Sequence, residues 1–269
     1  MIRVSQYPEM LQFSCLGRDC NIFHFVTTRN GGVGNANYGS FNVSPYCGDD
    51  ESAVKDNLQR LCTVAKIEPA ALLLPYQVHE DRIAVVDEAL LSMNAEARLK
   101  ALSGFDAIVT NVPGVAVAVS TADCVPVLLY DPVQKVVAAV HAGWRGTVKR
   151  ICSKTIALMH EEYDCDPANV QAAIGPSIGF DAFEVGDEVV DAFASATYDL
   201  DALVGRNAKT GKAHIDLWNA NKSDLLRAGV REELVEVAEV CTYTHHELFF
   251  SARRLGIKSG RIVSGIVIR

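Results

Sequence analysis

The stretch TADCVPVLLYDPVQKVVAAVHAGWRG, residues 121–146, holds two apolar runs separated by a short polar segment. Both runs have the length and the β-branched residues of buried strands, and Asp131 followed by Pro132 suits a β-turn between them. The stretch therefore predicts a buried β-hairpin. Its open end carries reactive side chains, because Cys124 lies where the first strand begins and His141 lies where the second strand ends.

The register of this hairpin decides whether the two side chains meet. If the turn occupies residues 131–134, Tyr130 pairs with Lys135 and Cys124 lies directly opposite His141. Directly opposed residues of an antiparallel pair have Cβ atoms about 5 Å apart. That separation suits two ligands of one metal ion, or a thiol and its base. A slip of one residue would place the side chains on different faces, so the inference depends on the turn.

A thiolate and an imidazole together suit a borderline metal such as zinc, and a catalytic zinc site takes three protein ligands. His79, in the segment PYQVHEDRI between two strand-like runs, is the candidate third ligand. We expect His79, Cys124 and His141 to bind Zn²⁺, with copper as an alternative ion. Two other interpretations stay open: a buried thiol beside hydrogen-bonded histidines, or a Cys124 nucleophile activated by His141.

The residues that follow His141 favour an anion site. In the segment AGWRG, glycines flank Trp144 and Arg145, and a helix is expected from about Thr147. Free backbone N–H groups at a helix N-terminus and a guanidinium both attract anions, so we expect phosphate to bind here. The alternative is that the glycines only allow the chain to turn and that Arg145 pairs with a surface carboxylate.

Composition excludes several classes of partner. The 269 residues are 49% hydrophobic and 22% charged, with a formal net charge of -8, and so acidic a chain is a poor candidate for nonspecific nucleic-acid binding. The most apolar run, residues 112–130, is interrupted by Asp123 and Pro126, so we expect no membrane partner. The eight cysteines form no CxxC pair, and no secretory signal is evident. We therefore expect reduced thiols and a cytoplasmic location.

Strand-like runs alternate with helical patterns along the chain, and no segment resembles an interdomain linker. This pattern predicts a single mixed α/β domain over residues 1–269. Strands are expected near residues 21–28, 71–74, 83–87, 106–110, 115–120, 125–130, 135–141, 170–175, 235–240 and 261–269. Helices are expected over residues 49–66, 147–163, 183–193 and 217–229.

Several motifs occur together in an order that is specific to one family. They are TRNGGVGNANYGSFN (28–42), QVH (77–79), TADCVPVLL (121–129), HAGWRG (141–146), IGPSIG (174–179), FEVG (183–186), HIDLWNAN (214–221), CTYT (241–244) and FFSARR (249–254). The chain resembles the laccase-domain proteins of the YfiH type. These were formerly described as polyphenol oxidases and are now described as multifunctional purine nucleoside phosphorylases. The resemblance runs from about residue 23 to residue 268.

The resemblance implies a four-layer α/β/β/α sandwich with mixed β-sheets and a zinc site at His79, Cys124 and His141. It also implies phosphorolysis of adenosine, inosine, guanosine and methylthioadenosine, together with adenosine deamination. Arg145 would face substrate or phosphate and join Cys124 and His141 in catalysis, while Arg29 and Asn42 would lie near the substrate. The expected partners are purine nucleosides and phosphate, for a monomer or homodimer.

Two alternative functions remain at this stage. A copper-dependent polyphenol oxidase would need on the order of ten histidine ligands for a multinuclear cluster, whereas the chain has seven histidines and no HxH pair. A cysteine hydrolase that edits peptidoglycan precursors would use Cys124 as its nucleophile. Asp123 is a weaker candidate for the acid of phosphorolysis. The segment FDAFEVG, residues 180–186, lacks the cysteines that family members often carry there, which bears on substrate preference.

Overall fold

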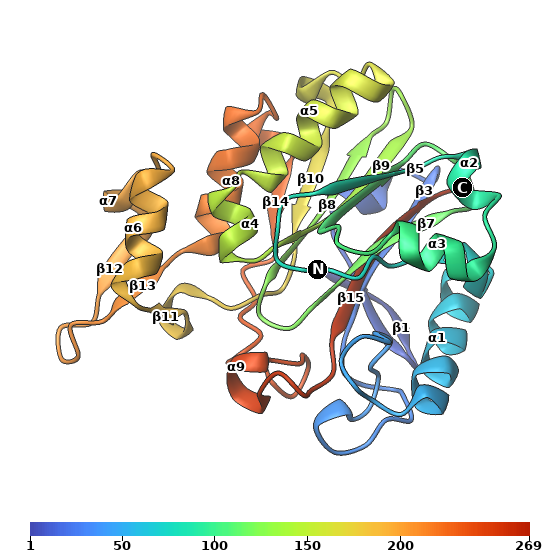
Figure 1. Cartoon of the computed structure of the whole chain (residues 1–269), viewed down its shortest axis with the longest axis horizontal. Helices are drawn as coiled ribbons and strands as arrows, with labels where there is room; N and C mark the ends of the chain where they lie inside the picture. Colours follow the sequence, from blue (N-terminus) through green and yellow to red (C-terminus); the bar gives the residue numbers. More distant parts are fainter.

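The fold is built on two facing mixed β-sheets (Figure 1). The computed structural model describes residues 1–269, apart from the side chain of Arg18. Within this described part, the first six-stranded sheet has the order β1 (Ile2–Gln6), β2 (Glu9–Gln12), β3 (Ile22–Thr27), β15 (Ile262–Ile268), β7 (Ala116–Thr121) and β4 (Leu72–Leu73). The second has the order β14 (Val235–Val237), β10 (Gln171–Ile174), β8 (Val125–Asp131), β9 (Val136–Ala142), β6 (Ala107–Thr110) and β5 (Ile83–Val86).

The described helices lie mostly on the outer faces of these sheets (Figure 1). They are α1 (Glu51–Ala65), α2 (Glu88–Leu91), α3 (Ala95–Ala101), α4 (Trp144–Val148), α5 (Ile151–Tyr163), α6 (Asp187–Ser195), α7 (Leu200–Leu203), α8 (Leu217–Arg227) and α9 (Ala252–Leu255). A small third sheet of β11 (Glu184–Val185), β13 (Ala213–Ile215) and β12 (Val204–Arg206) lies beside α6 and α7, at the left of Figure 1. None of the described helices is long and apolar enough to cross a bilayer.

Side-chain alternation along the strands produces three apolar interfaces and hence four layers. Between the sheets, Val117 and Val119 of β7 pack with Leu128 of β8 and Val137 of β9. On the outer face of the first sheet, buried residues of α1 cover Phe25, Ala118 and Val263. On the outer face of the second sheet, α5 and α8 cover alternate residues of β8 and β9. The expected four-layer α/β/β/α sandwich with mixed sheets is confirmed.

The β8–β9 hairpin forms, but the predicted register is wrong by two residues. Asp131 pairs with Val136, and His141 lies opposite Pro126 rather than Cys124. Lys135, which adopts a left-handed conformation at φ 53°, belongs to the loop, so the four-residue loop lies at residues 132–135 instead of the predicted 131–134. Because the shift is even, Cys124 and His141 stay on the same face of the sheet as diagonal neighbours.

The helix predicted to begin near Thr147 is also different in the structure. Helix α4 begins at Trp144 with Gly143 as its N-cap, and α5 begins at Ile151. Arg150 separates the two helices in a left-handed conformation, with φ 62°. Its guanidinium stacks on Tyr198 and donates to the carboxylate of Asp224. These tertiary contacts stabilise a helix break that local sequence does not signal. By contrast, α1 ends at Ala65, close to its predicted end at Lys66.

Candidate metal centre

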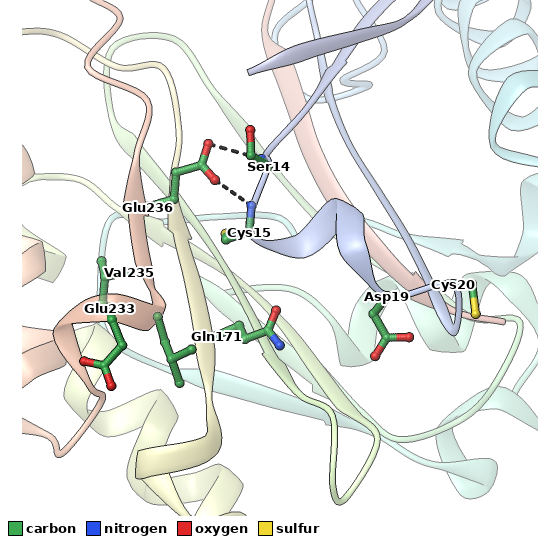
Figure 2. A pocket seen from close by; sticks show the side chains of 9 residues that line it. Ser14, Cys15, Asp19, Cys20, Gln171, Glu233, Val235 and Glu236 are labelled. Atoms are coloured by element: carbon green, nitrogen blue, oxygen red, sulfur yellow. Dashed lines mark hydrogen bonds between the residues drawn. The ribbon is translucent and has the colours of Figure 1, made fainter.

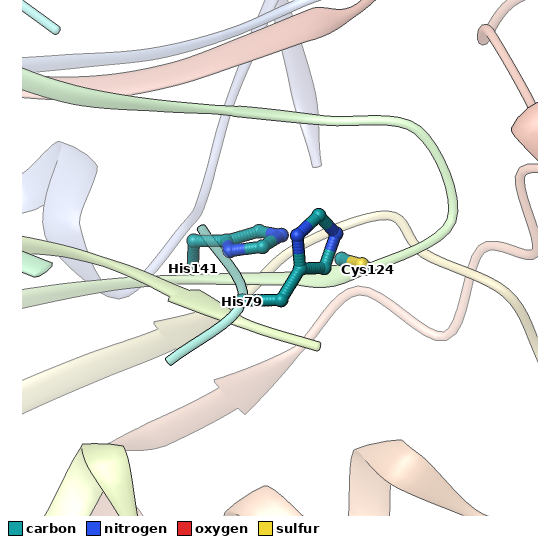
Figure 3. Close-up of side chains that lie close together, drawn as sticks. All are labelled: His79, Cys124 and His141. Atoms are coloured by element: carbon teal, nitrogen blue, oxygen red, sulfur yellow. The ribbon is translucent and has the colours of Figure 1, made fainter. Parts of the chain in front are cut away.

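Three predicted ligands meet at the open end of the space between the two sheets. The alternation of β9 places His141 on the face toward the first sheet, and Cys124 directly precedes β8. His79 reaches the same place from the loop between β4 and β5. The candidate ligand atoms of His79, Cys124 and His141 all lie within 4.8 Å of one another. Figure 3 shows the two imidazoles and the thiol side by side.

Asp106, which the sequence analysis missed, holds two of these residues in place. Its carboxylate is fully buried and accepts a hydrogen bond from Nδ1 of His141 at 2.7 Å. It also accepts from the backbone N–H groups of Val78, His79 and Glu80, at 3.2, 2.9 and 2.8 Å. This pairing leaves Nε2 of His141 for a metal, the arrangement common for metal-bound histidines. The only signal in the sequence is a carboxylate directly before an apolar strand.

The backbone is in an uncommon conformation at two positions beside the site. His79 has φ 61° and the residue before Cys124, Asp123, has φ 86°. Such conformations cost energy in non-glycine residues and persist where surrounding contacts impose them. For Asp123, the contacts are hydrogen bonds to its carboxylate from Thr242, Ser251 and the backbone N–H of Arg253. The Asp123 carboxylate therefore anchors the ligand loop to the C-terminal segment, and both of its oxygens are already hydrogen-bonded.

The shape and the donor chemistry of the group fit a single metal ion such as zinc. A Cβ atom added at Gly143 would lie 3.1 Å from Sγ of Cys124, 3.4 Å from Cδ2 of His79 and 3.8 Å from Cε1 of His141. The missing side chain of Gly143 thus leaves space beside all three residues. Thiolates and imidazoles are both donors that zinc and copper bind, and three protein ligands leave a position for a fourth, exchangeable ligand.

The electrostatics of Cys124 and His141 are strongly coupled. Burial by itself would raise the pKa of Cys124, but His141 and His79 outweigh it and lower the pKa to about 6. Burial would likewise lower the pKa of His141, but the Cys124 thiolate and the Asp106 carboxylate raise it to about 9. The thiol is therefore deprotonated near neutral pH, the form that binds a metal ion.

A pocket of about 270 Å³ opens onto the three ligands. Its other described walls come from the loop around Ser44 and Tyr46, from Gln77 and Ser120, and from Arg261 just before β15. Gln77 fixes the His79 loop to β7, because its side chain accepts from the N–H of Ser120 and donates to the carbonyl of Ser120. Neither Gln77 nor Arg261 was predicted from the sequence as part of the site.

The structure places the three predicted substrate residues outside the lining of this pocket. The exposed guanidinium of Arg145 stacks on the ring of Trp144 at 4.3 Å. Arg29 donates to the carbonyls of Gly39 and His246. The fully buried Asn42 accepts from the backbone N–H of Arg261 and donates to the carboxylate of Asp49. In this geometry Arg29 and Asn42 hold loops around the pocket.

A second surface hollow, among the described residues, does not compete as a metal centre. It measures about 510 Å³ and lies between the N-terminal segment and β14 (Figure 2). Glu236 there accepts from the backbone N–H groups of Ser14 and Cys15. Burial and the neighbouring Glu236 raise the pKa of Cys15 to about 12, so its thiol stays protonated. Among the described residues, the His79–Cys124–His141 group is the one cluster whose geometry suits a metal.

This fold and this thiol–imidazole centre are those of a laccase-domain protein. The chain belongs to that family, since the model described as multi-copper polyphenol oxidoreductase laccase matches residues 23–269. The family expected from the sequence motifs is thereby confirmed.

Relatives of the chain carry names of nucleoside enzymes. The chain is 47% identical over 268 residues to a purine nucleoside phosphorylase of Bacteroides thetaiotaomicron, covering 100% of this chain and 99% of the relative. It is 44% identical over 242 residues to adenosine deaminase RL5 from an unknown prokaryotic organism, covering 90% and 92%. Among solved structures, the hypothetical protein YfiH of Bacillus licheniformis has a TM-score of 0.89 at 31% identity, covering 97% of each chain.

Proposed function

We propose that this chain is a zinc-dependent purine nucleoside phosphorylase that also deaminates adenosine. The observation that carries the proposal is the His79–Cys124–His141 group, supported by Asp106 and opening onto one pocket. Relatives named purine nucleoside phosphorylase and adenosine deaminase, aligned over 100% and 90% of this chain, support the substrate class. We propose adenosine, inosine, guanosine and methylthioadenosine as the nucleosides.

The two reactions differ in the molecule that attacks the nucleoside. In phosphorolysis, a phosphate oxygen bonds to C1′ of the ribose while the C1′–N9 bond breaks. The electron pair passes to the purine, which takes a proton from solvent, and ribose 1-phosphate is released. In deamination, water adds at C6 of adenosine and ammonia leaves, which yields inosine. A bound zinc ion would supply a Lewis acid and an activated water for such chemistry.

The residues of this chain organise the site around that centre. Asp106 holds the proton on Nδ1 of His141 and positions the His79 loop through three backbone hydrogen bonds. His79, Cys124 and His141 would hold the ion, and Cys124 and His141 thereby take part in catalysis. The pocket walls at Tyr46 and Tyr76 offer aromatic surface for a purine. A contact between Arg145 and substrate remains a prediction of the family resemblance, as do such contacts of Arg29 and Asn42.

The remaining expectations belong to the same proposal. One domain over residues 1–269 is supported by the apolar core that the two sheets share. A cytoplasmic location, a monomeric or homodimeric state, and the lack of nucleic-acid and membrane partners stay predictions from composition and resemblance.

Copper oxidase chemistry of the multinuclear kind is poorly supported by the ligands. His24 accepts from the backbone N–H of Phe13 and does not belong to the ligand cluster. His160, His214 and His245 each place Nδ1 against a backbone carbonyl. Among the described residues, these histidines form no second cluster with His79 and His141. A single copper ion in the His79–Cys124–His141 group is the remaining oxidase alternative.

A cysteine hydrolase that edits peptidoglycan precursors is the second candidate. The observation that favours it is the lowered pKa of Cys124, which provides a thiolate next to an imidazole. In that case Cys124 would attack a carbonyl carbon and His141 would protonate the leaving amine.

One set of assays separates these functions. Purified protein is incubated with inosine and phosphate, and hypoxanthine and ribose 1-phosphate are measured; adenosine without phosphate is assayed for inosine and ammonia. We expect both activities to disappear with a chelator and to return with zinc. A zinc-loaded protein that forms neither product refutes the proposal. Release of an amino acid from a muropeptide precursor, insensitive to chelator, would indicate the hydrolase, and oxidation of a phenol only after copper loading would indicate the oxidase.

A further inference from the structure

We propose that Arg261 is the residue that binds the phosphate co-substrate of this site. The inference rests on the proposed phosphorylase function and names a residue that sequence motifs did not single out. Arg261 directly precedes β15 and lines the pocket that also contains His79, Cys124 and His141. Among the described side chains that line this pocket, it is the one with a permanent charge.

The positive charge of Arg261 is not neutralised within the protein. Among the described side chains, no carboxylate forms an ion pair with Arg261. Its recorded acceptors are backbone carbonyls and one hydroxyl of the segment that immediately precedes it. A half-buried guanidinium without a counter-ion, in a pocket without carboxylates, favours an anionic ligand.

The guanidinium is held in one orientation and keeps two donors for a ligand. Nη1 donates to the carbonyls of Ser259 and Gly260, at 2.6 and 3.0 Å, and Nη2 donates to the carbonyl of Ile257 at 2.9 Å. A guanidinium has five N–H groups. The N–H of Nε and one N–H of Nη2 therefore have no acceptor among the described residues. Phosphate can take two such donors together, and an already positioned donor loses little entropy on binding.

Asn42 links the backbone of Arg261 to another wall of the pocket. Its Oδ1 accepts from the backbone N–H of Arg261 at 3.0 Å and from the backbone N–H of Ser44 at 3.2 Å. The side-chain amide thus joins the start of β15 to the loop that carries Ser44 and Tyr46, which also line the pocket. Asn42 acts as a positioning residue for the proposed phosphate site.

The predicted anion site at Arg145 lacks these properties. Arg145 is exposed and stacks on Trp144, and it does not line the pocket in this structure. Helix α4, which contains it, is one short turn of five residues. Phosphate bound at Arg261 would lie in the same cavity as the metal ligands. Phosphorolysis requires phosphate and the nucleoside to meet in one such cavity.

The test compares Arg261→Gln with Lys258→Gln, which removes a neighbouring exposed cation that does not line the pocket. Inosine phosphorolysis is measured at varied phosphate, and adenosine deamination is measured in phosphate-free buffer. Loss of a charge-assisted pair predicts a rise of about 10- to 100-fold in KM for phosphate in Arg261→Gln. KM for inosine and the deaminase activity should change less than about threefold, because an isolated cation contact affects the anion alone. Lys258→Gln should keep both activities.

Phosphate binding is also measured without turnover. Line broadening of inorganic phosphate in ³¹P NMR is recorded with chelator-treated protein, so that the metal does not contribute. We expect broadening with the unaltered protein and with Lys258→Gln, and its loss with Arg261→Gln. If Arg261→Gln melts well below the unaltered protein, Arg261→Lys is compared instead. This variant keeps the positive charge but loses the paired N–H donors of the guanidinium. We expect its KM for phosphate to rise several-fold.

The outcomes distinguish this inference from the proposed function. An unaltered protein without phosphorolysis refutes the function, whereas the NMR measurement still tests Arg261. An unchanged KM for phosphate in Arg261→Gln overturns the inference, and so does a parallel loss of deamination, which would indicate a structural role. If Arg261→Gln lowers activity only toward nucleoside 5′-monophosphates, the residue binds the phosphate of a nucleotide rather than free phosphate, and the inference is likewise overturned.

Discussion

Replacing Asp106 by asparagine tests whether a buried carboxylate organises the metal centre. Oδ1 of Asp106 accepts from His141 and from the N–H of His79, and Oδ2 accepts from the N–H groups of Val78 and Glu80. An asparagine keeps one oxygen and presents an NH₂ group to the other two donors. Two hydrogen bonds to a charged acceptor are lost, at about 1.5–3 kcal/mol each. The expected loss of unfolding free energy is therefore about 3–6 kcal/mol.

The same substitution should weaken metal binding. With its partner altered, His141 is no longer held with Nε2 toward the site, and losses of about 10- to 100-fold in affinity accompany such changes. Zinc affinity is measured by competition with a chromophoric chelator, and stability by thermal denaturation. At about 2–4 °C per kcal/mol, the melting temperature should fall by about 6–24 °C. Asp187→Asn, at an exposed position paired with Arg206, is the control. Zinc affinity and stability equal to those of the control would refute the reasoning.

Three further predictions concern the same centre. Gly143→Ala should reduce bound zinc in metal analysis while the far-UV circular dichroism is unchanged, because the new Cβ would lie 3.1 Å from Sγ of Cys124; full zinc occupancy would contradict this. Zinc affinity should fall as the pH drops below about 9, where zinc must displace a proton from His141, and more steeply below about 6, where the Cys124 thiolate becomes protonated. A zinc affinity that does not change between about pH 5 and pH 8 would contradict this prediction. The last prediction concerns the stability of chelator-treated protein. The lowered pKa of Cys124 stabilises the fold, and this stabilisation is lost as the pH falls through about 6. The raised pKa of His141 also stabilises the fold, and this stabilisation is lost as the pH rises through about 9. Melting temperature should thus be highest between these limits, and Cys124→Ser should flatten the profile.

The hairpin shows how far sequence reasoning reached and where it failed. Alternation of apolar residues predicts both strands and the shared face of Cys124 and His141 correctly. The register was wrong by two, because the four-residue loop, with Lys135 in a left-handed conformation, lies one residue further along the chain than predicted, and a single sequence does not signal this. The site prediction survived because side chains alternate with a period of two, so that an even shift preserves the face.

The sequence alone determined the strands and helices that build the sandwich, the family, and the three candidate ligands. Those features depend on local periodicity and on residue types in a fixed order. Only the tertiary structure decided that Asp106 supports two ligands, that Gly143 leaves room beside all three, and that Arg261 rather than Arg145 lines the pocket. These roles depend on contacts between segments far apart in the chain, such as β6 with β9 and β15 with β7. Hydrogen bonds and shared cavities of this kind form only when distant segments pack together. The spacing of residues along the chain therefore does not predict them.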